Sequence, residues 1–135
     1  MSDSSIFSVA GSALNAQSVR LNTIASNMAN ADVAASSAEQ TFRARLPVFK
    51  AQTGGGQLSG VQVAEIVESN APARMRFQPD HPQANDEGYV YLPNVNLIEQ
   101  MTDMISASRS YQANLEVITT SKELMLQTLQ LGQRS

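Results

Sequence analysis

The residues best suited to acid–base or metal chemistry gather in one polar stretch of the chain. His81 is the only histidine, and Asp80, Asp86 and Glu87 lie close to it in the sequence. An imidazole beside carboxylates can transfer protons or bind a metal ion. A metal site needs several such ligands, but the chain has no second histidine and no cysteine. Because His81 also stands between two prolines, we predict a turn here, with no catalytic, cofactor or metal site and no enzymatic activity.

Four arginines form two pairs with i,i+2 spacing, so that each pair would share one face of a strand: Arg43, Arg45, Arg74 and Arg76. Such pairs could meet a phosphate or an acidic partner. A solvated strand face is the stronger interpretation, because 12 acidic residues outnumber 9 basic ones and the net charge of −3 does not favour nucleic-acid binding. If this segment packs against another subunit, the arginines are its best charged contacts.

Motifs for nucleophilic or phosphate chemistry are absent from the sequence. No serine stands in a GxSxG motif, and the run Gly54–Gly56 fits neither GxGxxG nor GKS/T. No segment approaches the roughly 20 apolar residues of a membrane span. No secretory signal is visible either, so we expect no direct membrane span and any export to proceed without a cleaved signal peptide. No small-molecule substrate is indicated.

The strongest signal is structural and lies in the segment from Asn96 to Leu131, which contains neither proline nor glycine. Asn96 is placed to cap a helix, and Gly132 to end it. Such a helix would be about 52 Å long, more than the width of a compact domain of this size. It therefore needs another long helix as cover. Its apolar residues recur in steps of four and three, typical of a heptad pattern: Leu97, Met101, Met104, Tyr111, Leu115, Ile118, Met125 and Leu129.

The N-terminal segment from Asp3 to Ala31 predicts this second helix. Its other faces carry small and amide side chains instead of the glutamates and lysines of a helix that faces water. We infer that it is covered on more than one side by neighbours beyond its own chain, and that it is marginally stable alone. Its apolar seam repeats every seven residues along two interleaved rows: Phe7, Leu14, Leu21 and Met28, and Ala10, Ile24 and Ala31.

The middle of the chain has the sequence pattern of short strands. Alternating and β-branched residues predict strands near 42–48, 61–67, 73–78 and 89–92, joined by a glycine turn and a proline-containing loop. The predicted fold class is therefore mainly α: two long terminal helices paired as an antiparallel coiled coil, with a small β-hairpin-rich insert. The corresponding division of the chain is an N-terminal helix at 1–33, a β-rich insert or extended arm at 34–93 and a C-terminal helix at 94–135.

The two helices alone would leave apolar flanks exposed on the longer one, at Ile98, Ile105, Val117 and Leu124. Exposed apolar surface of that extent marks an interaction site, which favours self-assembly through the helices. The alternative is a soluble helical adaptor or chaperone-like module that binds a partner helix, and it would be expected to carry charged outer helix faces. A small hydrolase using His81 is the third hypothesis.

Several motifs resemble those of the flagellar rod, hook and hook-associated proteins. The segment Leu21–Asp32 (LNTIASNMANAD) is similar to their N-terminal motif, and Tyr111–Asn114 (YQAN) to their C-terminal (Tyr/Phe)-x-Ala-Asn signature. The segments Pro79–Pro82, Gly88–Val95 and Ala107–Asn114 resemble more specifically the short proteins of the proximal rod. The resemblance covers residues 1–33 and about 77–131.

The resemblance implies a structural subunit of the proximal rod of the bacterial flagellar basal body. Such subunits pass through the flagellar type III export apparatus into the periplasm. There they assemble helically with copies of themselves and other rod proteins, and the membrane ring at the rod base is a further expected partner. The rod is a drive shaft that transmits torque and encloses the export channel. The expected assembly interface comprises Phe7, Leu14, Leu21, Ile24, Asn27, Met28, Asn30, Leu97, Met101, Met104, Tyr111, Asn114, Leu115, Ile118 and Met125.

Overall fold

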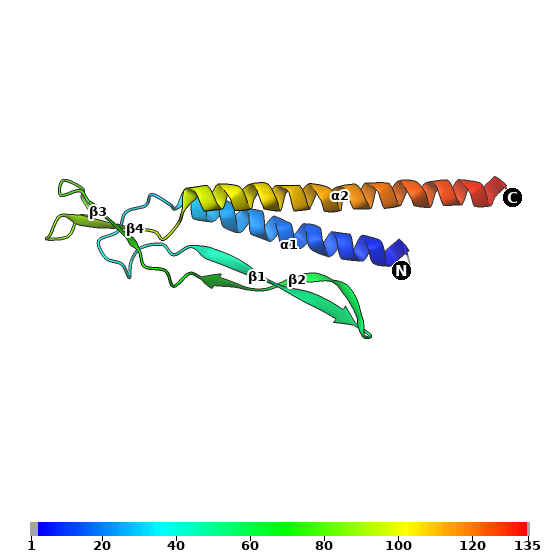
Figure 1. The fold of residues 1–135 in the computed structure, drawn as a ribbon, viewed down its shortest axis with the longest axis horizontal. Helices are drawn as coiled ribbons and strands as arrows, with labels where there is room; N and C mark the ends of the chain where they lie inside the picture. Colours follow the sequence, from blue (N-terminus) through cyan, green and yellow to red (C-terminus); the bar gives the residue numbers. More distant parts are fainter. Residues whose placement is uncertain (1–2, 135) are drawn as a thin grey trace.

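The computed structural model describes residues 3–134 and contains two long helices with two β-hairpins between them in the chain. The helices lie side by side and run in opposite directions, and the first hairpin lies along α1 (Figure 1). The second hairpin lies beyond the end of the helices where α1 finishes and α2 starts (Figure 1). The elements in chain order are α1 (Asp3–Ala29), β1 (Arg45–Gly54), β2 (Gln57–Glu68), β3 (Arg74–Phe77), β4 (Tyr89–Leu92) and α2 (Leu97–Arg134).

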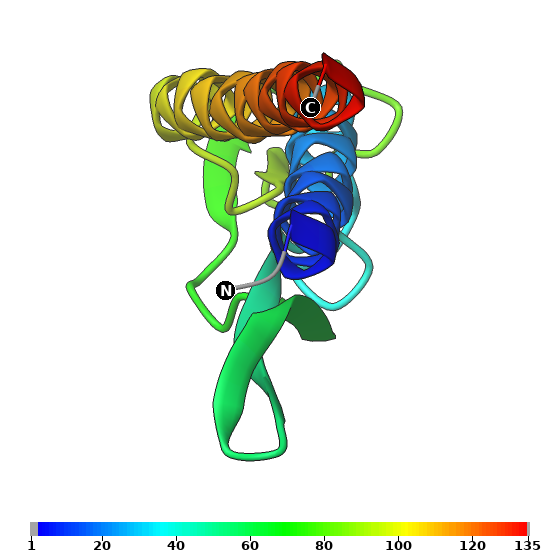
Figure 2. The ribbon, with the colours of Figure 1, turned by 90° about the vertical axis from the view of Figure 1, so that its right-hand side faces the viewer.

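The predicted arrangement of two terminal helices around a small β insert is confirmed, whereas the expectation of a mainly α chain is only partly right. The helices take up 27 and 38 residues, about half of the chain. The end-on view shows the two helix axes crossing at an angle, with the β1–β2 hairpin on the far side of α1 (Figure 2). A continuous coiled coil along both helices stays a prediction.

Helix α2 begins as its sequence predicts but ends later. The side-chain Oδ1 of Asn96 accepts hydrogen bonds from the backbone N–H groups of Ile98 and Glu99, at 3.0 and 3.3 Å, and so caps the first turn. The predicted end at Gly132 is wrong, because α2 continues through this glycine to Arg134. A glycine costs a helix only about 1 kcal/mol, and it ends one only where the chain turns into the left-handed conformation.

The β1–β2 hairpin is antiparallel, with Arg45 opposite Glu68 at its open end. Its turn consists of Gly55 and Gly56, whose φ angles of 60° and 84° are both left-handed. Two consecutive positive φ angles are what a tight hairpin turn requires, and glycine adopts them at little steric cost. The glycine run therefore forms the predicted turn, although β1 begins at Arg45, a little later than expected.

The β3–β4 hairpin is shorter and gains a third partner from the linker after α1. The backbone N–H of Ala35 donates to the Tyr91 carbonyl at 2.8 Å, and the Tyr91 N–H donates back to Ala35 at 2.9 Å. Phe77 and Tyr89 pack edge to face with their ring centroids 5.2 Å apart. The segment after α1 thus pairs with the outer edge of β4.

Helix α1 is covered from two sides, and much of that cover comes from its own chain. Helix α2 lies on one side and the β1–β2 hairpin on the other. The Ser12 hydroxyl accepts a hydrogen bond from the backbone N–H of Val61 in β2 at 3.0 Å. The chain's own hairpin therefore supplies one cover of α1, because small side chains on α1 let the hairpin backbone approach, while cover by neighbouring chains stays a prediction.

One buried asparagine joins α1 to both β1 and α2. The Asn27 side chain is 1% exposed, and its Oδ1 accepts from the backbone N–H of Arg45 at 2.9 Å. Its Nδ2 donates to the Arg45 carbonyl at 2.8 Å and to Oε1 of Gln100 at 3.1 Å. The amide thus pairs with one residue of β1 as a neighbouring strand would, and it also satisfies the buried Gln100 of α2.

Two further side chains tie the same end of the molecule together. Arg74 in β3 donates through Nε to the Pro93 carbonyl at 2.9 Å and through Nη2 to the Ala31 carbonyl at 2.8 Å. Asn94 accepts from the backbone N–H of Ala44 at 2.7 Å. We call the set Asn27, Arg74, Asn94 and Gln100 the root junction. Beside it lies a small apolar core of Ala31, Ala44 and Val95 with Phe42 packed against it.

Replacing Asn27 by aspartate tests the root junction. The change keeps the shape and the acceptor, but it sets a carboxylate against the Arg45 carbonyl and Oε1 of Gln100, where an N–H donated before. We expect a loss of about 2–4 kcal/mol in the free energy of unfolding, because a buried donor is lost and a charge is desolvated. Urea unfolding followed by the helical circular-dichroism signal measures it. Asn22→Asp, at an exposed position of α1, is the matched control and should change little; equal losses in the two variants would contradict this role of Asn27.

Candidate assembly surface

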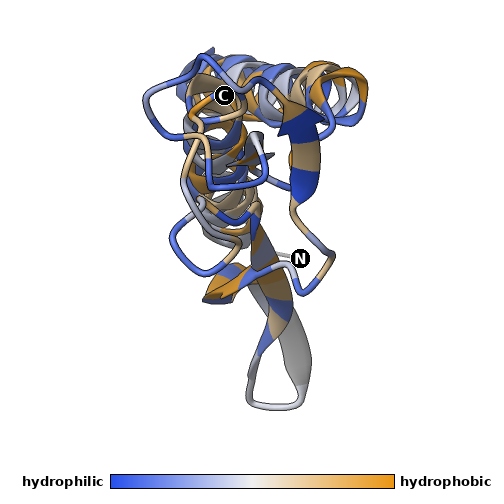
Figure 3. Cartoon of the chain, turned by 90° about the vertical axis from the view of Figure 1, so that its left-hand side faces the viewer, coloured by the Kyte–Doolittle hydropathy of each residue, from blue (hydrophilic) through white to orange (hydrophobic). Residues whose placement is uncertain are grey.

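Helix α2 carries most of its large apolar side chains on its outside. Among the residues that the structure describes, α2 buries only Gln100 and Ala107. Its exposed large hydrophobic residues are Leu97, Ile98, Met101, Ile105, Leu115, Val117, Leu124, Leu126, Leu129 and Leu131. We call these ten residues the outer apolar face of α2; at about 100° per residue they lie on both flanks of the side that faces α1, with Val117, Leu124 and Leu131 on one flank and Met101, Leu115 and Leu129 on the other. In the hydropathy view the ribbon of α2 alternates between hydrophobic and hydrophilic segments, and hydrophobic ones reach its outer surface (Figure 3).

One of the two rows of α2 that face α1 is built from small and polar residues. Gln100 and Ala107 are buried seven residues apart, and Asn114 and Ser121 continue this row half-buried. Small side chains allow two helices to approach closely, and Gln100 is held by its hydrogen bond to Asn27. The row of α2 that contains Gln100 and Asn114 therefore lies one residue before the predicted apolar row that contains Met101 and Leu115.

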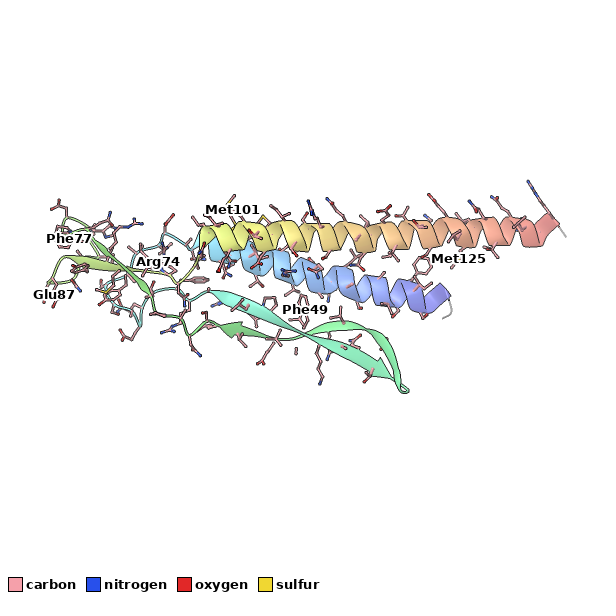
Figure 4. All side chains as sticks on the ribbon, viewed as in Figure 1. Phe49, Arg74, Phe77, Glu87, Met101 and Met125 are labelled. Carbon is pink, nitrogen blue, oxygen red and sulfur yellow. The ribbon has the colours of Figure 1, made fainter. Side chains whose placement is uncertain are left out.

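The predicted seam of α2 is consequently divided between two environments. Half of its positions lie toward α1 and are half-buried: Met104, Tyr111, Ile118 and Met125. The other half are exposed: Leu97, Met101, Leu115 and Leu129. The labelled side chains show this division, since Met125 points toward α1 and Met101 points away from it (Figure 4). Within one chain, therefore, only part of the apolar seam of α2 is covered.

The predicted seam of α1 is better covered. Ile24 is buried, and the four residues spaced seven apart are half-buried: Phe7, Leu14, Leu21 and Met28. Gln17 interrupts this seam, and its buried Oε1 has no hydrogen-bond partner within residues 3–134. An unsatisfied amide weakens the packing of α1, because a buried acceptor without a donor costs about 1–3 kcal/mol.

The three motif asparagines form hydrogen bonds within the chain. Asn27 belongs to the root junction, as described above. Asn30 donates through Nδ2 to the Ser26 carbonyl at 2.8 Å, where α1 ends. Asn114 donates through Nδ2 to the Ser110 carbonyl of its own helix at 2.7 Å. The prediction that asparagines bond at helix ends fits Asn30, while their expected contacts between subunits stay a prediction.

Three of the four paired arginines already have contacts within the chain. Arg43 donates through Nη1 to the Ser69 carbonyl at 3.4 Å. Arg45 lies 3.9 Å from the Glu68 carboxylate, and its guanidinium stacks over the Phe42 ring. Arg74 belongs to the root junction, and Arg76 is exposed on β3. The i,i+2 spacing gave no signal for these intrachain roles, because Arg43 and Arg74 bond to backbone carbonyls distant in the sequence and Arg45 pairs with Glu68 on the opposite strand.

His81 lies in the predicted turn. Its Nδ1 accepts a hydrogen bond from the backbone N–H of Gln83 at 3.0 Å, and its carbonyl accepts from Ala84. The described part of the chain has no group of three or more histidine, cysteine or acidic residues that could hold a metal ion. Among the same residues, no helix is long and apolar enough to cross a bilayer.

The root residues Asn94 and Gln100 were missed by sequence reasoning. Asn94 follows Pro93 just before α2, and this position between a proline and a helix start indicates a turn residue with backbone bonds. Gln100 carries no local signal, because its importance depends on Asn27, far away in the sequence. Together these contacts position α2 so that its outer apolar face points away from the rest of the chain, a surface suited to packing against other helices.

Comparison with known proteins identifies the context of this surface. Residues 7–35 match the family model described as flagella basal body rod protein, and residues 86–131 match the model of the flagellar basal body rod FlgEFG protein C-terminal. The flagellar basal-body rod protein FlgC of Yersinia enterocolitica is 54% identical over 134 residues, which cover 98% of this chain and 100% of that protein.

More distant relatives carry the same name. FlgC of Salmonella typhimurium is 50% identical, with 95% of this chain and 96% of that protein covered. FlgC of Borreliella burgdorferi is 34% identical, with 96% and 97% covered. The two matched family models fall on α1 and α2, which are the elements that form the candidate assembly surface. The chain therefore belongs to the FlgC family of flagellar basal-body rod proteins.

Proposed function

We propose that this structural rod subunit assembles helically in the proximal, periplasmic part of the rod and works without catalysing a reaction. In that position it transmits torque as part of the drive shaft and encloses the export channel. The observation that carries the proposal is the outer apolar face of α2, ten large hydrophobic side chains that one chain leaves exposed in a family of structural rod proteins.

Burial by neighbouring subunits accounts for the pattern of both helices. The small and polar face of α2 is satisfied by α1, so the apolar residues left outside are free to pack against helices of other subunits. Heptad pairing as a coiled coil then forms between subunits as well as within one. We assign Leu97, Met101 and Leu115 to the contact between subunits, and the half-buried seam residues of α1 to the pairing within one chain.

The partners that we propose are copies of this chain, other rod proteins, the type III export apparatus and the membrane ring at the rod base. The β insert supplies the charged part of these contacts. Among its four paired arginines Arg76 is the most available, since Arg43, Arg45 and Arg74 already have partners in the chain. In an assembly the three engaged arginines hold the insert in shape while Arg76 faces a neighbour.

A lysine at Leu115 tests burial of the outer apolar face. Leu115 is exposed in the single chain, so Leu115→Lys should leave the monomer folded. In the rod the ammonium would be desolvated without a partner, which costs several kcal/mol, and we expect motility to be lost. Swimming of cells that depend on this chain measures the effect, with circular dichroism of the purified variant as the check on folding.

The matched control for Leu115→Lys is Thr120→Lys. Thr120 is exposed on the face of α2 that carries Glu116 and Glu123, at helical spacings of four and three residues. A lysine there gains two favourable neighbours and should leave swimming unchanged. Normal swimming with Leu115→Lys would show that this face stays in water in the rod.

Amide hydrogen exchange tests whether α2 becomes ordered on assembly. Every residue from 126 to 134 is exposed, so this part of α2 has no packing to protect it in the free chain. We expect its amides to exchange fast in the monomer and slowly in isolated basal bodies. The amides around Gln100, held by the root junction, should exchange slowly in both. Slow exchange of residues 126–134 in the dilute monomer would contradict the proposal.

A further inference from the structure

We propose that the start of α2, with the pocket beside it, is a socket for the C-terminal helix end of an axially adjoining rod subunit. The inference rests on the proposed function and adds which part of a neighbour contacts which part of this chain. The partner segment is a leucine-rich amphipathic helix end of the kind that α2 itself carries. The contact is thus head to tail along the helix axis.

The socket is an open pocket of about 500 Å³ next to the first turn of α2. Ala71, Pro72 and Val95 line it together with Leu97 and Ile98, and the polar groups of the lining come from Arg74, Asn94 and Asn96. Ile98 is 76% exposed, and Met101 and Ile105 extend the apolar surface along α2. Two of the polar lining residues, Arg74 and Asn94, are fixed by the root junction, so the pocket has a rigid rim.

The segment that fits the socket lies at the other end of α2. Helix α2 has 38 residues and α1 has 27, so α2 runs on past the start of α1 (Figure 1). In this overhang all residues from 126 to 134 are exposed. Its large apolar side chains, together with Leu124 just before it, are Leu126, Leu129 and Leu131. These side chains are between 50% and 67% exposed.

The exposed apolar surface of α2 is divided into two ends by a middle of another kind. The stretch from Ser106 to Asn114 consists of small and polar residues apart from the half-buried Tyr111. The apolar surface beside the socket and the apolar surface of the overhang lie about 40 Å apart along α2 at the usual rise per residue. Two different patches on one rigid helix cannot satisfy each other within a chain. A contact between unlike patches repeats without closing and gives a filament, as a rod requires.

Charge agrees with this direction of docking. Glu99 is exposed in the first turn of α2, and Arg134 is exposed in its last turn. Placing the end of one helix near the start of the next brings these opposite charges together. It also aligns the helix dipoles head to tail, with a carbonyl-rich end facing an N–H-rich end. Placing the starts of two α2 helices against each other would instead bring two Glu99 side chains together, and placing two ends together would do the same for Arg134.

The partner helix is expected from a rod subunit because α2 is a shared element. Residues 86–131 match a model of the C-terminal segment of flagellar basal body rod proteins. A neighbour in the rod therefore presents a C-terminal helix of the same type, whether it is a copy of this chain or another rod protein. The chemistry that the socket recognises is common to both: aliphatic side chains at the end of a helix.

A photo-crosslinking amino acid at Met101 tests this contact in assembled basal bodies. Met101 is 54% exposed and points away from α1, so the substitution leaves the monomer contacts intact (Figure 4). We expect a cross-link, mapped by mass spectrometry, to the last three turns of the C-terminal helix of a rod subunit. The same probe at Glu116, on the charged face of α2, is the control and should give a several-fold weaker cross-link to that segment.

Other results would overturn the inference. Cross-links from Met101 to an N-terminal helix, to a β insert or to a protein outside the rod would show another occupant of the socket. If the Met101 variant does not support swimming, the probe is moved to Ile98, which is more exposed and lines the pocket itself. Absence of the chain from isolated basal bodies would instead refute the proposed function, so the two failures are distinguishable.

Discussion

The arrangement of this molecule depends on one buried amide. Asn27 holds the backbone of β1 on one side and Gln100 of α2 on the other, through three hydrogen bonds of 2.8 to 3.1 Å. Because a buried amide must satisfy both its donor and its acceptor, this geometry fixes the rotation of α2 about its axis. That rotation turns Gln100 and Ala107 inward and leaves the large aliphatic residues of α2 outside. The surface proposed for assembly is thus a consequence of a polar contact.

The rotation of α2 that Asn27 fixes also limits the stability of a single chain. Its core consists mainly of small residues such as Ala31, Ala44 and Ala107, each of which removes little apolar area from water. Gln17 leaves a buried acceptor unsatisfied on α1. In the proposed assembly, the free energy of burying the outer apolar face is realised only between subunits and adds to the stability of each chain. The side of α2 that faces α1 therefore stabilises the single chain, and its outer apolar face is the part proposed for assembly.

Sequence reasoning recovered the elements of the fold well, because their signals are local. Asn96 caps α2, and Gly55 and Gly56 make the tight turn between β1 and β2, as their types predict. It failed at Gly132, where a possible stop signal was outweighed by the continuing helix. It also gave no indication that Ala35 pairs with Tyr91, because this pairing depends on a strand more than 50 positions away.

The sequence alone determined the two long helices, the hairpin-rich insert between them and the membership of a rod family, because periodicity, turn residues and motifs are written along the chain. Only the tertiary structure decided which face of each helix is used inside the subunit. A heptad pattern states that apolar residues share a side, but it does not state whether that side faces its own chain or a neighbour. Here hydrogen bonds between distant residues, Asn27 with Gln100 and Arg74 with Ala31, made that choice, and no pattern along the sequence encodes such pairs.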